Sequence, residues 1–216
     1  MFRRIAIAAS LALTSTSLYA TTYTLEPDYT QGVFRWNHLG FSSPAGQFAQ
    51  GTGTLEFDAT EPTRSSVSVT IPLGTLKTGV PALDDDFRST DFFDTVRFPS
   101  ATFKSTRVEK GATKNQLEVT GELNLHGVTK PVTLHVTVVK IGSNPRTGLP
   151  TVGFDAMTML ERSDFGLGKY VPQVGDEIQL HIISQAVEAK PYAEYLKARE
   201  AAEAAEAAKA RSAEHK

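Results

Sequence analysis

The 216-residue sequence contains no cysteine, one tryptophan and three methionines. The absence of cysteine excludes disulfides, thiolate metal sites and a thiol nucleophile, so a packed core has to stabilise the fold unaided. Long apolar runs are also missing, because no segment approaches the ~20 apolar residues that a transmembrane helix needs. The 22 basic and 24 acidic side chains nearly balance. We therefore expect neither nucleic acid nor an anionic membrane surface as a partner.

The first twenty residues have the pattern of a secretory signal peptide. Arg3 and Arg4 precede an apolar run from Ile5 to Leu13, and small residues lead to Ala20, the expected cleavage point. A transmembrane anchor is the weaker alternative, since the run is too short to cross a bilayer. Cleavage removes two basic side chains and leaves 20 basic against 24 acidic ones. We expect the mature chain in the periplasm.

From Thr21 to about Glu188, short β-branched and aromatic runs alternate with polar residues and are separated by Gly, Pro, Asn and Asp. Val132, Leu134 and Val136, for example, alternate with outward-facing polar residues. A period of two sends one face of each strand to the interior and the other to water. Seven or eight such strands predict an all-β barrel or sandwich and exclude a βαβ protein.

Two segments depart from this rhythm. Residues from Pro81 to Asp94 have helical spacing, and the acids from Asp84 to Asp86 favour a helix N-terminus. We expect one or two helical turns here, lying across a barrel end. Beyond Pro191 the composition changes to Ala, Glu, Lys and Arg, which predicts a helix. The predicted organisation is therefore a signal peptide at 1–20, a barrel at 21–190 and a helical tail at 191–216.

The tail lacks a wide apolar stripe, because only Tyr192, Tyr195 and Leu196 share an apolar face. We expect its first turn to dock on the barrel and the remainder to be solvated, with weak support from pairs such as Arg199 with Glu203. A helix that binds a protein partner is the alternative.

The stretch from Asp84 to Val108, DDDFRSTDFFDTVRFPSATFKSTRV, resembles the signature region of the YceI-like family of lipocalin-like barrels. Four more segments follow in the family order: NHLGFS at 37–42, VTIPLGTLKTG at 69–79, GELNLHGVTKPVTL at 121–134 and RSDFGLGKY at 162–170. The resemblance implies an extended antiparallel barrel of eight strands, a size that can hold one small ligand. In the family that ligand is a polyisoprenoid, a quinone with such a tail, or a fatty-chain amide.

Two positions depart from the family pattern. Relatives often carry Arg-Asp-x-His-Leu-Arg-Ser before the DFFD segment, whereas this chain has Leu83 in place of the Arg and Asp86 in place of the His. The cation that could meet a phosphate-bearing head group is then lost. A neutral head, such as a quinone or an amide, becomes the expected ligand.

Aromatic residues concentrate in the first half of the chain, and strand parity points several of them inward. Core packing explains each one singly, since large aromatics dominate any core. Taken together with flexible Met157 and Met159 and with small Ala101 and Ala156, they predict an elongated apolar slot. The predicted ligand-binding residues are Phe34, Trp36, His38, Phe41, Phe48, Phe57, Phe87, Arg88, Phe92, Phe93, Phe98, Phe103, Ala156, Met157 and Met159.

Polar members of this set have alternative roles. His38 either contacts the polar head of a ligand or is a hydrogen-bonded core histidine. Arg88 and Asp91 form a structural ion pair or gate the mouth, and the structural role is favoured. No histidine pair has metal-ligand spacing, so we expect neither a zinc site nor any cofactor other than the bound ligand.

The predicted function is a carrier, scavenger or buffer for an apolar molecule, with a role under envelope stress, and not an enzyme. The sequence has no nucleophile elbow and no inward Ser, His and Asp set. The alternatives are an interaction module that uses the tail and, less favoured, a hydrolase of apolar esters that uses His38 or Asp86. The oligomeric state stays open, although a homodimer is the commonest soluble assembly.

Overall fold

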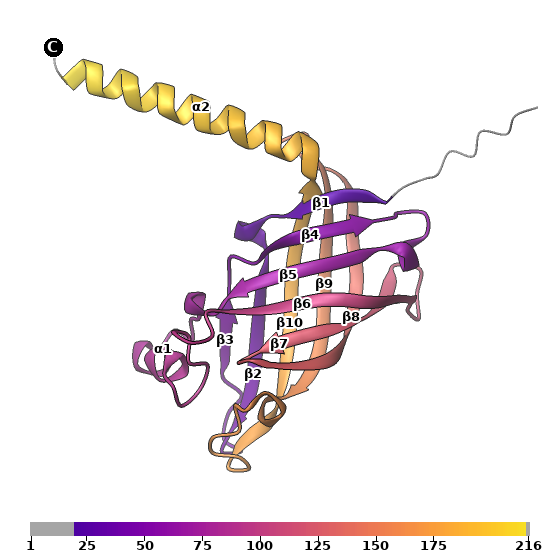
Figure 1. Cartoon of the computed structure of the whole chain (residues 1–216), viewed down its shortest axis with the longest axis vertical. Helices are drawn as coiled ribbons and strands as arrows, with labels where there is room; N and C mark the ends of the chain where they lie inside the picture. The colour runs from indigo at the N-terminus through magenta and orange to yellow at the C-terminus, as the bar shows by residue number, and fades with distance from the viewer. Residues whose placement is uncertain (1–19, 215–216) are drawn as a thin grey trace, which may run out of the picture.

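The computed structural model describes the backbone of residues 20–214 and the side chains of residues 20–211. The predicted signal peptide lies outside the described residues except for Ala20. The part of the chain that is described folds around one β-barrel, from which a helix leaves at one end (Figure 1).

Within residues 20–214, ten antiparallel strands form one sheet. They are β1 (Thr21–Leu25), β2 (Gln31–His38), β3 (Ala45–Phe48), β4 (Thr52–Phe57), β5 (Ser66–Pro72), β6 (Ser100–Lys110), β7 (Gln116–Leu125), β8 (Val128–Ser143), β9 (Pro150–Glu161) and β10 (Val174–Glu188). Eight of them close a ring in the order β1-β4-β5-β6-β7-β8-β9-β10, because β10 also pairs with β1. The prediction of an all-β, eight-stranded antiparallel barrel is confirmed.

The two remaining strands extend this ring. β1 and β2 lie along the same edge of β10, interrupted by the 3-10 helix η1 (Pro27–Tyr29), and β3 pairs with β2 as β4 pairs with β1. After the interruption the buried Thr30 lies with its Oγ1 3.0 Å from Oγ of Ser184 in β10. Gln47 of β3 exchanges backbone hydrogen bonds of 2.8 and 2.9 Å with Lys77, so β3 is also linked to the segment between β5 and β6.

The interior is filled according to strand parity. Val132, Leu134 and Val136 are buried, whereas Thr133 and His135 between them are exposed, as the alternation predicts. Buried side chains form three clusters. The first joins β6, β7, β8 and β9 to the β9–β10 connection, and the second joins β1, β4, β9 and β10. The third joins β2 to the segments that cross one end of the barrel.

That end carries the connections β2–β3, β5–β6, β7–β8 and β9–β10. The β5–β6 connection contains the 3-10 helix η3 (Leu73–Thr75) and the helix α1 (Pro81–Arg88), and the β9–β10 connection contains η4 (Arg162–Phe165). α1 and the β9–β10 connection lie at the lower left and bottom of the barrel (Figure 1). The predicted helix at a barrel end is present, but it stops at Arg88, and residues 89–94 form turns.

The helix starts as predicted, with Asp84 in its first turn. It begins at Pro81, whose fixed φ suits the first helical position. Asp84 is buried, and its Oδ1 accepts hydrogen bonds from the backbone N–H and the hydroxyl of Thr78 at 2.6 and 2.7 Å. Asp84 therefore holds the incoming loop against the helix.

The opposite end of the barrel continues into α2 (Ala189–Glu214), which projects away from the strands (Figure 1). A short 3-10 helix, η2 (Pro62–Arg64), lies in the β4–β5 connection at this end. Tyr192 and Leu196 are half-buried, and the described side chains beyond them are exposed. Arg199 Nε lies 3.2 Å from Glu203 Oε1, as expected. Neither α1 nor α2 combines the length and the apolar character that crossing a bilayer requires.

Candidate ligand cavity

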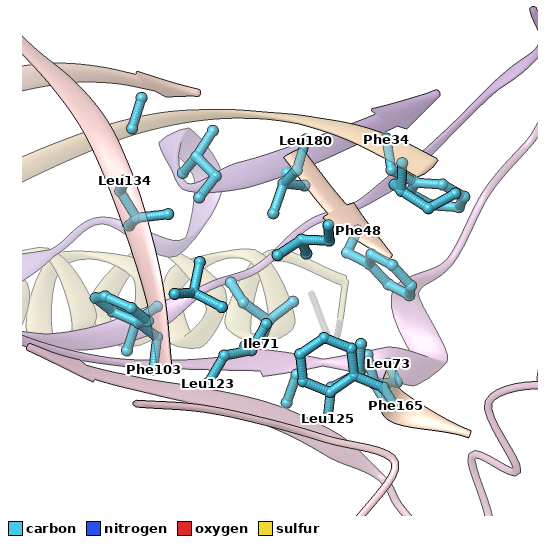
Figure 2. A pocket seen from close by; sticks show the side chains of 18 of the residues that line it. Phe34, Phe48, Ile71, Leu73, Phe103, Leu123, Leu125, Leu134, Phe165 and Leu180 are labelled. Atoms are coloured by element: carbon cyan, nitrogen blue, oxygen red, sulfur yellow. The ribbon is translucent and has the colours of Figure 1, made fainter. Parts of the chain in front are cut away.

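The barrel encloses a cavity of about 640 Å³ that runs from the α1 end towards the α2 end. Most of its lining residues are apolar, and they come from all eight strands of the closed ring as well as from β2, β3 and α1. The side chains drawn in Figure 2 are carbon throughout and converge on the cavity from several strands. A space of this volume is typical of a small-molecule site.

Aromatic rings line the α1 half of the cavity. The rings of Phe34 and Trp36 stack with centroids 5.7 Å apart, and Trp36 meets Phe87 of α1 at 5.4 Å. Phe87 then meets Phe92 at 5.2 Å, and Phe92 meets Tyr170 of the β9–β10 connection at 6.3 Å. The series of rings thus leads from β2 out to the end of the barrel. Offset and edge-to-face contacts at these distances stabilise aromatic pairs.

Helix α1 contributes to this cluster through one face. Leu83 and Phe87 are four residues apart, so they lie on the same side of the helix. Both line the cavity, and both pack on the cluster formed by Phe34 and Trp36. These apolar contacts hold α1 over the end of the barrel.

Aliphatic side chains dominate the half nearer α2, although Phe57 and Phe154 also meet there at 5.8 Å. The aliphatic lining of this half includes Leu55, Val67, Val108, Leu117, Val119 and Val136. An apolar chain in this half would be in contact with methyl groups, and a planar group in the other half with rings.

A glycine makes room for the central ring of the aromatic half. Gly46 of β3 pairs directly with Phe34 of β2, and the Phe34 ring lies over the glycine. A Cβ at position 46 would be 2.4 Å from Phe34 Cζ, which is closer than real contacts allow. The Phe34 rotamer therefore depends on the absence of a side chain at Gly46.

The α1 end is the mouth of the cavity. His38, Ser42, Asp86 and Tyr170 line the cavity there and are exposed to solvent. Lys169 crosses the mouth, because its Nζ contacts an Oδ of Asp91. This hydrogen bond raises the pKa of Lys169. The pair joins the β9–β10 connection to the turn that follows α1.

Arg162 is the second basic residue of the lining, and its guanidinium is occupied by the backbone. It donates hydrogen bonds to the carbonyl oxygens of Leu167, Lys169, Val174 and Gly175, the last three at 2.8, 2.9 and 2.9 Å. Burial lowers its pKa. The residue holds the β9–β10 connection in shape. Among the described residues, no three His, Asp or Glu side chains come together as metal ligands would.

Residues 23–186 match the family model of the YceI-like domain. The chain belongs to the YceI family. Protein YceI of Escherichia coli O157:H7 is 35% identical over 184 residues, which cover 84% of this chain and 95% of that protein. Protein YceI of Salmonella arizonae matches with the same identity and coverage.

Solved YceI-like structures have the same fold. Burkholderia cenocepacia BcnA superimposes with a TM-score of 0.64 at 26% identity, covering 72% of this chain and 95% of BcnA. The Campylobacter jejuni YceI protein gives a TM-score of 0.64 at 24% identity, with 71% and 90% covered. A polyisoprenoid binding domain from Saccharophagus degradans gives 0.58 at 13% identity, with 78% and 99% covered. At such identities the last two show the fold alone.

The YceI-like barrel brings most of the predicted site residues together. Those that line the cavity are Phe34, Trp36, His38, Phe48, Phe57, Phe87, Phe92, Phe93, Phe103 and Ala156. Their contact with a ligand stays a prediction. Phe41, Arg88, Phe98, Met157 and Met159 lie outside the lining.

The prediction that Met157 and Met159 face the interior is wrong. Ala156 and Thr158 are buried inside, so parity turns the two methionines of the same strand outward. Their exposed fractions are 45% and 51%.

Phe41, Phe98 and Arg88 are also placed differently from the prediction. Phe41 is 91% exposed at the tip of the β2–β3 turn. Phe98 packs with its ring 4.7 Å from that of His126. Arg88 donates a 2.6 Å hydrogen bond to the carbonyl oxygen of Leu76 and pairs with Asp84 and Asp85. The expected pair of Arg88 with Asp91 is therefore wrong, since Asp91 pairs with Lys169.

The prediction missed the aliphatic part of the site. These residues include Ile71, Leu123, Leu125, Leu134, Leu180 and Ile182. Their inward parity is visible in the sequence, because each lies on the apolar face of an alternating strand. The predicted site was built on aromatic residues and did not include them.

Proposed function

We propose that this chain binds one long apolar molecule with a neutral head group inside its barrel. The candidates are a polyisoprenoid, an isoprenoid quinone, or a fatty-chain lipid or amide. The observation that carries the proposal is the cavity of about 640 Å³ with its overwhelmingly apolar lining. A chain that buries roughly 500 Å² there gains about 12 kcal/mol, before the cost of immobilising it.

The two halves of the cavity suit the two parts of such a ligand. The aliphatic half near α2 accommodates the chain. The rings of Trp36, Phe87 and Phe92 lead to the mouth and suit a planar head, such as a quinone ring. His38 and Ser42 at the mouth offer hydrogen bonds to carbonyl or hydroxyl oxygens of the head.

The charges at the mouth support a neutral head. Leu83 and Asp86, which replace the Arg and His of the family pattern, both line the cavity. The basic residues of the lining are already engaged, Arg162 by backbone carbonyls and Lys169 by Asp91. A pyrophosphate group at the mouth would face the carboxylate of Asp86, while Arg162 and Lys169 already have other partners. Burying a charge that is not compensated is costly.

The family adds support to this proposal. One structural neighbour is described as a polyisoprenoid binding domain. The signal-peptide pattern supports a periplasmic carrier or scavenger, and a role under envelope stress follows from that location. We propose that the barrel binds without catalysing. If an apolar ester were hydrolysed, and His38→Ala or Asp86→Asn abolished the turnover, the hydrolase alternative would hold instead.

The test begins with the ligand that the protein carries. Native mass spectrometry of gently purified protein should show added mass, and organic extraction should release the ligand. The delipidated protein should then take up an isoprenoid quinone with quenching of Trp36, which is the single tryptophan and lines the cavity. Repeated ligand-free preparations that take up neither a quinone nor a prenyl alcohol would refute the proposal.

A pair of variants on β9 ties binding to the cavity. Ala156→Phe places a ring in the cavity and should weaken quinone binding roughly tenfold or more, because the ring takes space and apolar contact area that the ligand would otherwise occupy. Met157→Phe is the matched control, since the adjacent side chain is exposed on the outer wall. Thermal unfolding of both variants checks that they are folded. Equal affinity of the two variants would place the ligand elsewhere.

A further inference from the structure

Exposed apolar side chains gather around the mouth of the cavity. They are Leu39, Phe41, Val80, Val96 and Tyr170, which we call the mouth rim. Phe41 and Val96 are almost fully exposed, at 91% and 94%. They come from three connections that are far apart in the sequence and meet at the α1 end. Large apolar groups held in water in this way indicate a contact surface.

The β2–β3 turn presents Leu39 and Phe41 by its geometry. His38 and Ser42 pair through the backbone, with His38 N donating to Ser42 O at 2.9 Å, and both line the cavity. Leu39 and Phe41 lie between these two residues and are exposed. Leu39 has a left-handed backbone with φ of 57°, which is unfavourable for a residue with a side chain.

The β5–β6 connection carries two rim residues that are close in sequence to residues of the lining. Val80 directly precedes α1, and Val96 lies three residues beyond the cavity-lining Phe93. The backbone N–H groups of Arg97 and Phe98 bond to the carbonyl of Asp94 at 3.0 and 2.8 Å, which fixes the turn that carries Val96.

Tyr170 connects the rim to the cavity directly. It is more than half exposed, lines the cavity, and has a φ of 66°. The rim is therefore continuous with the aromatic half of the cavity.

Charges of both signs surround the rim. Asp85 and Asp86 of α1 are exposed, as are Lys77 and Arg97. This mixture provides no basic patch that would attract an anionic surface. The chemistry of the rim fits an apolar layer under neutral head groups better than an anionic partner.

We propose that the mouth rim rests on a lipid bilayer surface of zwitterionic lipid, and that the ligand passes directly between bilayer and cavity. This inference rests on the proposed function. Each CH₂ group of a chain lowers by about fourfold the rate at which the chain leaves an apolar phase for water. Direct contact between rim and bilayer removes that step, since the chain moves from one apolar environment to another.

A second group of exposed apolar side chains lies on the outer wall of the barrel, on β8, β9 and β10. It comprises Val139, Ile141, Met157, Met159 and Ile183. His135, Asp155 and His181 interrupt it, the last two linked by a 2.6 Å hydrogen bond. Val139 and Ile141 of this group supply a matched control, because they are as apolar as the rim without adjoining the cavity entrance.

The experiment measures transfer of a pyrene-labelled long-chain alcohol from the full-length mature protein to phosphatidylcholine vesicles. The transfer rate should rise in proportion to vesicle concentration, as collisional transfer requires. Phe41→Ser combined with Val96→Ser should lower that slope roughly tenfold, because two inserting side chains are lost. Val139→Ser combined with Ile141→Ser should leave it unchanged, since both positions lie in the half of β8 that is farther from the mouth.

The outcomes separate this inference from the proposed function. Affinity for the labelled alcohol without vesicles should be the same in all variants, since none of the four positions lines the cavity. Failure of the wild type to bind the alcohol would refute the proposed function. Normal binding with a rate independent of vesicle concentration, or an equal loss in the wall variant, would overturn the inference alone.

Two further results would also overturn it. Partial replacement of phosphatidylcholine by phosphatidylglycerol should leave the rate unchanged, and a strong acceleration would indicate electrostatic docking. Sedimentation should show the same oligomeric state for the wild type and the rim variant. A wild-type dimer that the rim variant dissociates would mean that a second copy covers the rim.

Discussion

At the scale of single residues, the cavity depends on glycine as much as on aromatic side chains. Gly46→Ala places a methyl group against the Phe34 ring and pushes the ring towards the cavity. We expect a loss of about 1–3 kcal/mol in the free energy of unfolding and weaker quinone binding. Urea denaturation and Trp36 quenching measure the two effects.

Gly74→Ala is the control for this substitution. Gly74 has nothing within 4 Å of the position a Cβ would take, and its φ is not positive. The free energy of unfolding of this variant should stay the same or rise by up to about 1 kcal/mol, because alanine gives the unfolded chain less conformational freedom than glycine does. If both variants lost the same stability, the packing explanation would be wrong.

The direction of side chains along each strand could be predicted from the sequence, and the errors in the predicted site have a definite cause. Ala156 was correctly placed inside, which by itself requires Met157 to face outward. The methionines were included for their flexibility, a property of the side chain that does not set its direction. Phe41 was included among the aromatic residues of the slot, whereas the turn at Leu39 and Gly40 leaves it exposed.

At the scale of elements, the Lys169–Asp91 pair holds two connections together across the mouth. Asp91→Asn removes the charge of a residue outside the cavity lining. We expect the ligand to dissociate a few-fold faster, because an exposed ion pair contributes only about 0–1 kcal/mol. Stopped-flow displacement measures this rate.

Asp164→Asn serves as the control at the same end of the barrel. It breaks the exposed pair of Asp164 with Lys130, where Nζ and Oδ1 are 2.5 Å apart, between β8 and η4. The ligand should dissociate from this variant at the wild-type rate. Equal acceleration in both variants would show a general effect of charge at this end.

The anchoring of α1 predicts a pH dependence. Hydrogen bonds from Thr78 hold the pKa of Asp84 below its ordinary value. The carboxylate therefore stabilises the fold above about pH 4, and this contribution is lost as the pH falls through the lowered pKa. Asp84→Asn should be less stable than the wild type at pH 7, with a smaller difference at low pH.

Thermal unfolding at a series of pH values measures this convergence. Asp85→Asn is the matched control, because Asp85 is adjacent and its side chain is 82% exposed. A constant difference between the wild type and Asp84→Asn at all pH values would contradict the assigned role. The sequence located the start of this helix but not its end, and three successive acids do not reveal which one accepts hydrogen bonds from Thr78.

At the scale of the whole molecule, we expect the barrel to bind its ligand without the C-terminal helix. Deletion from Tyr192 onward should leave quinone uptake intact, because α2 contributes no residue to the cavity lining. Loss of Tyr192 and Leu196 should lower the thermal midpoint by a few degrees at most. Loss of quinone uptake would show that the tail supports the cavity, whereas loss of a co-purified protein alone would favour the interaction module.

The alternation and the family motifs were sufficient to predict the barrel class and its eight-stranded ring. They could not reveal that β1 and β2 share one edge of β10 with a 3-10 turn between them. That arrangement depends on pairing between residues that are far apart in the sequence, such as Leu25 with Ala186, which local patterns do not encode. The ion pair of Lys169 with Asp91 was not predicted, because it also joins residues that are far apart in the sequence.

The cavity also affects how the protein responds to compression. An apolar cavity is poorly hydrated, so unfolding removes void volume and the ligand-free protein becomes smaller in volume when it unfolds. Hydrostatic pressure should therefore unfold the empty barrel more readily than a fully packed domain of equal size. A bound ligand fills that volume, and thus makes the loaded protein the less compressible and more pressure-resistant form.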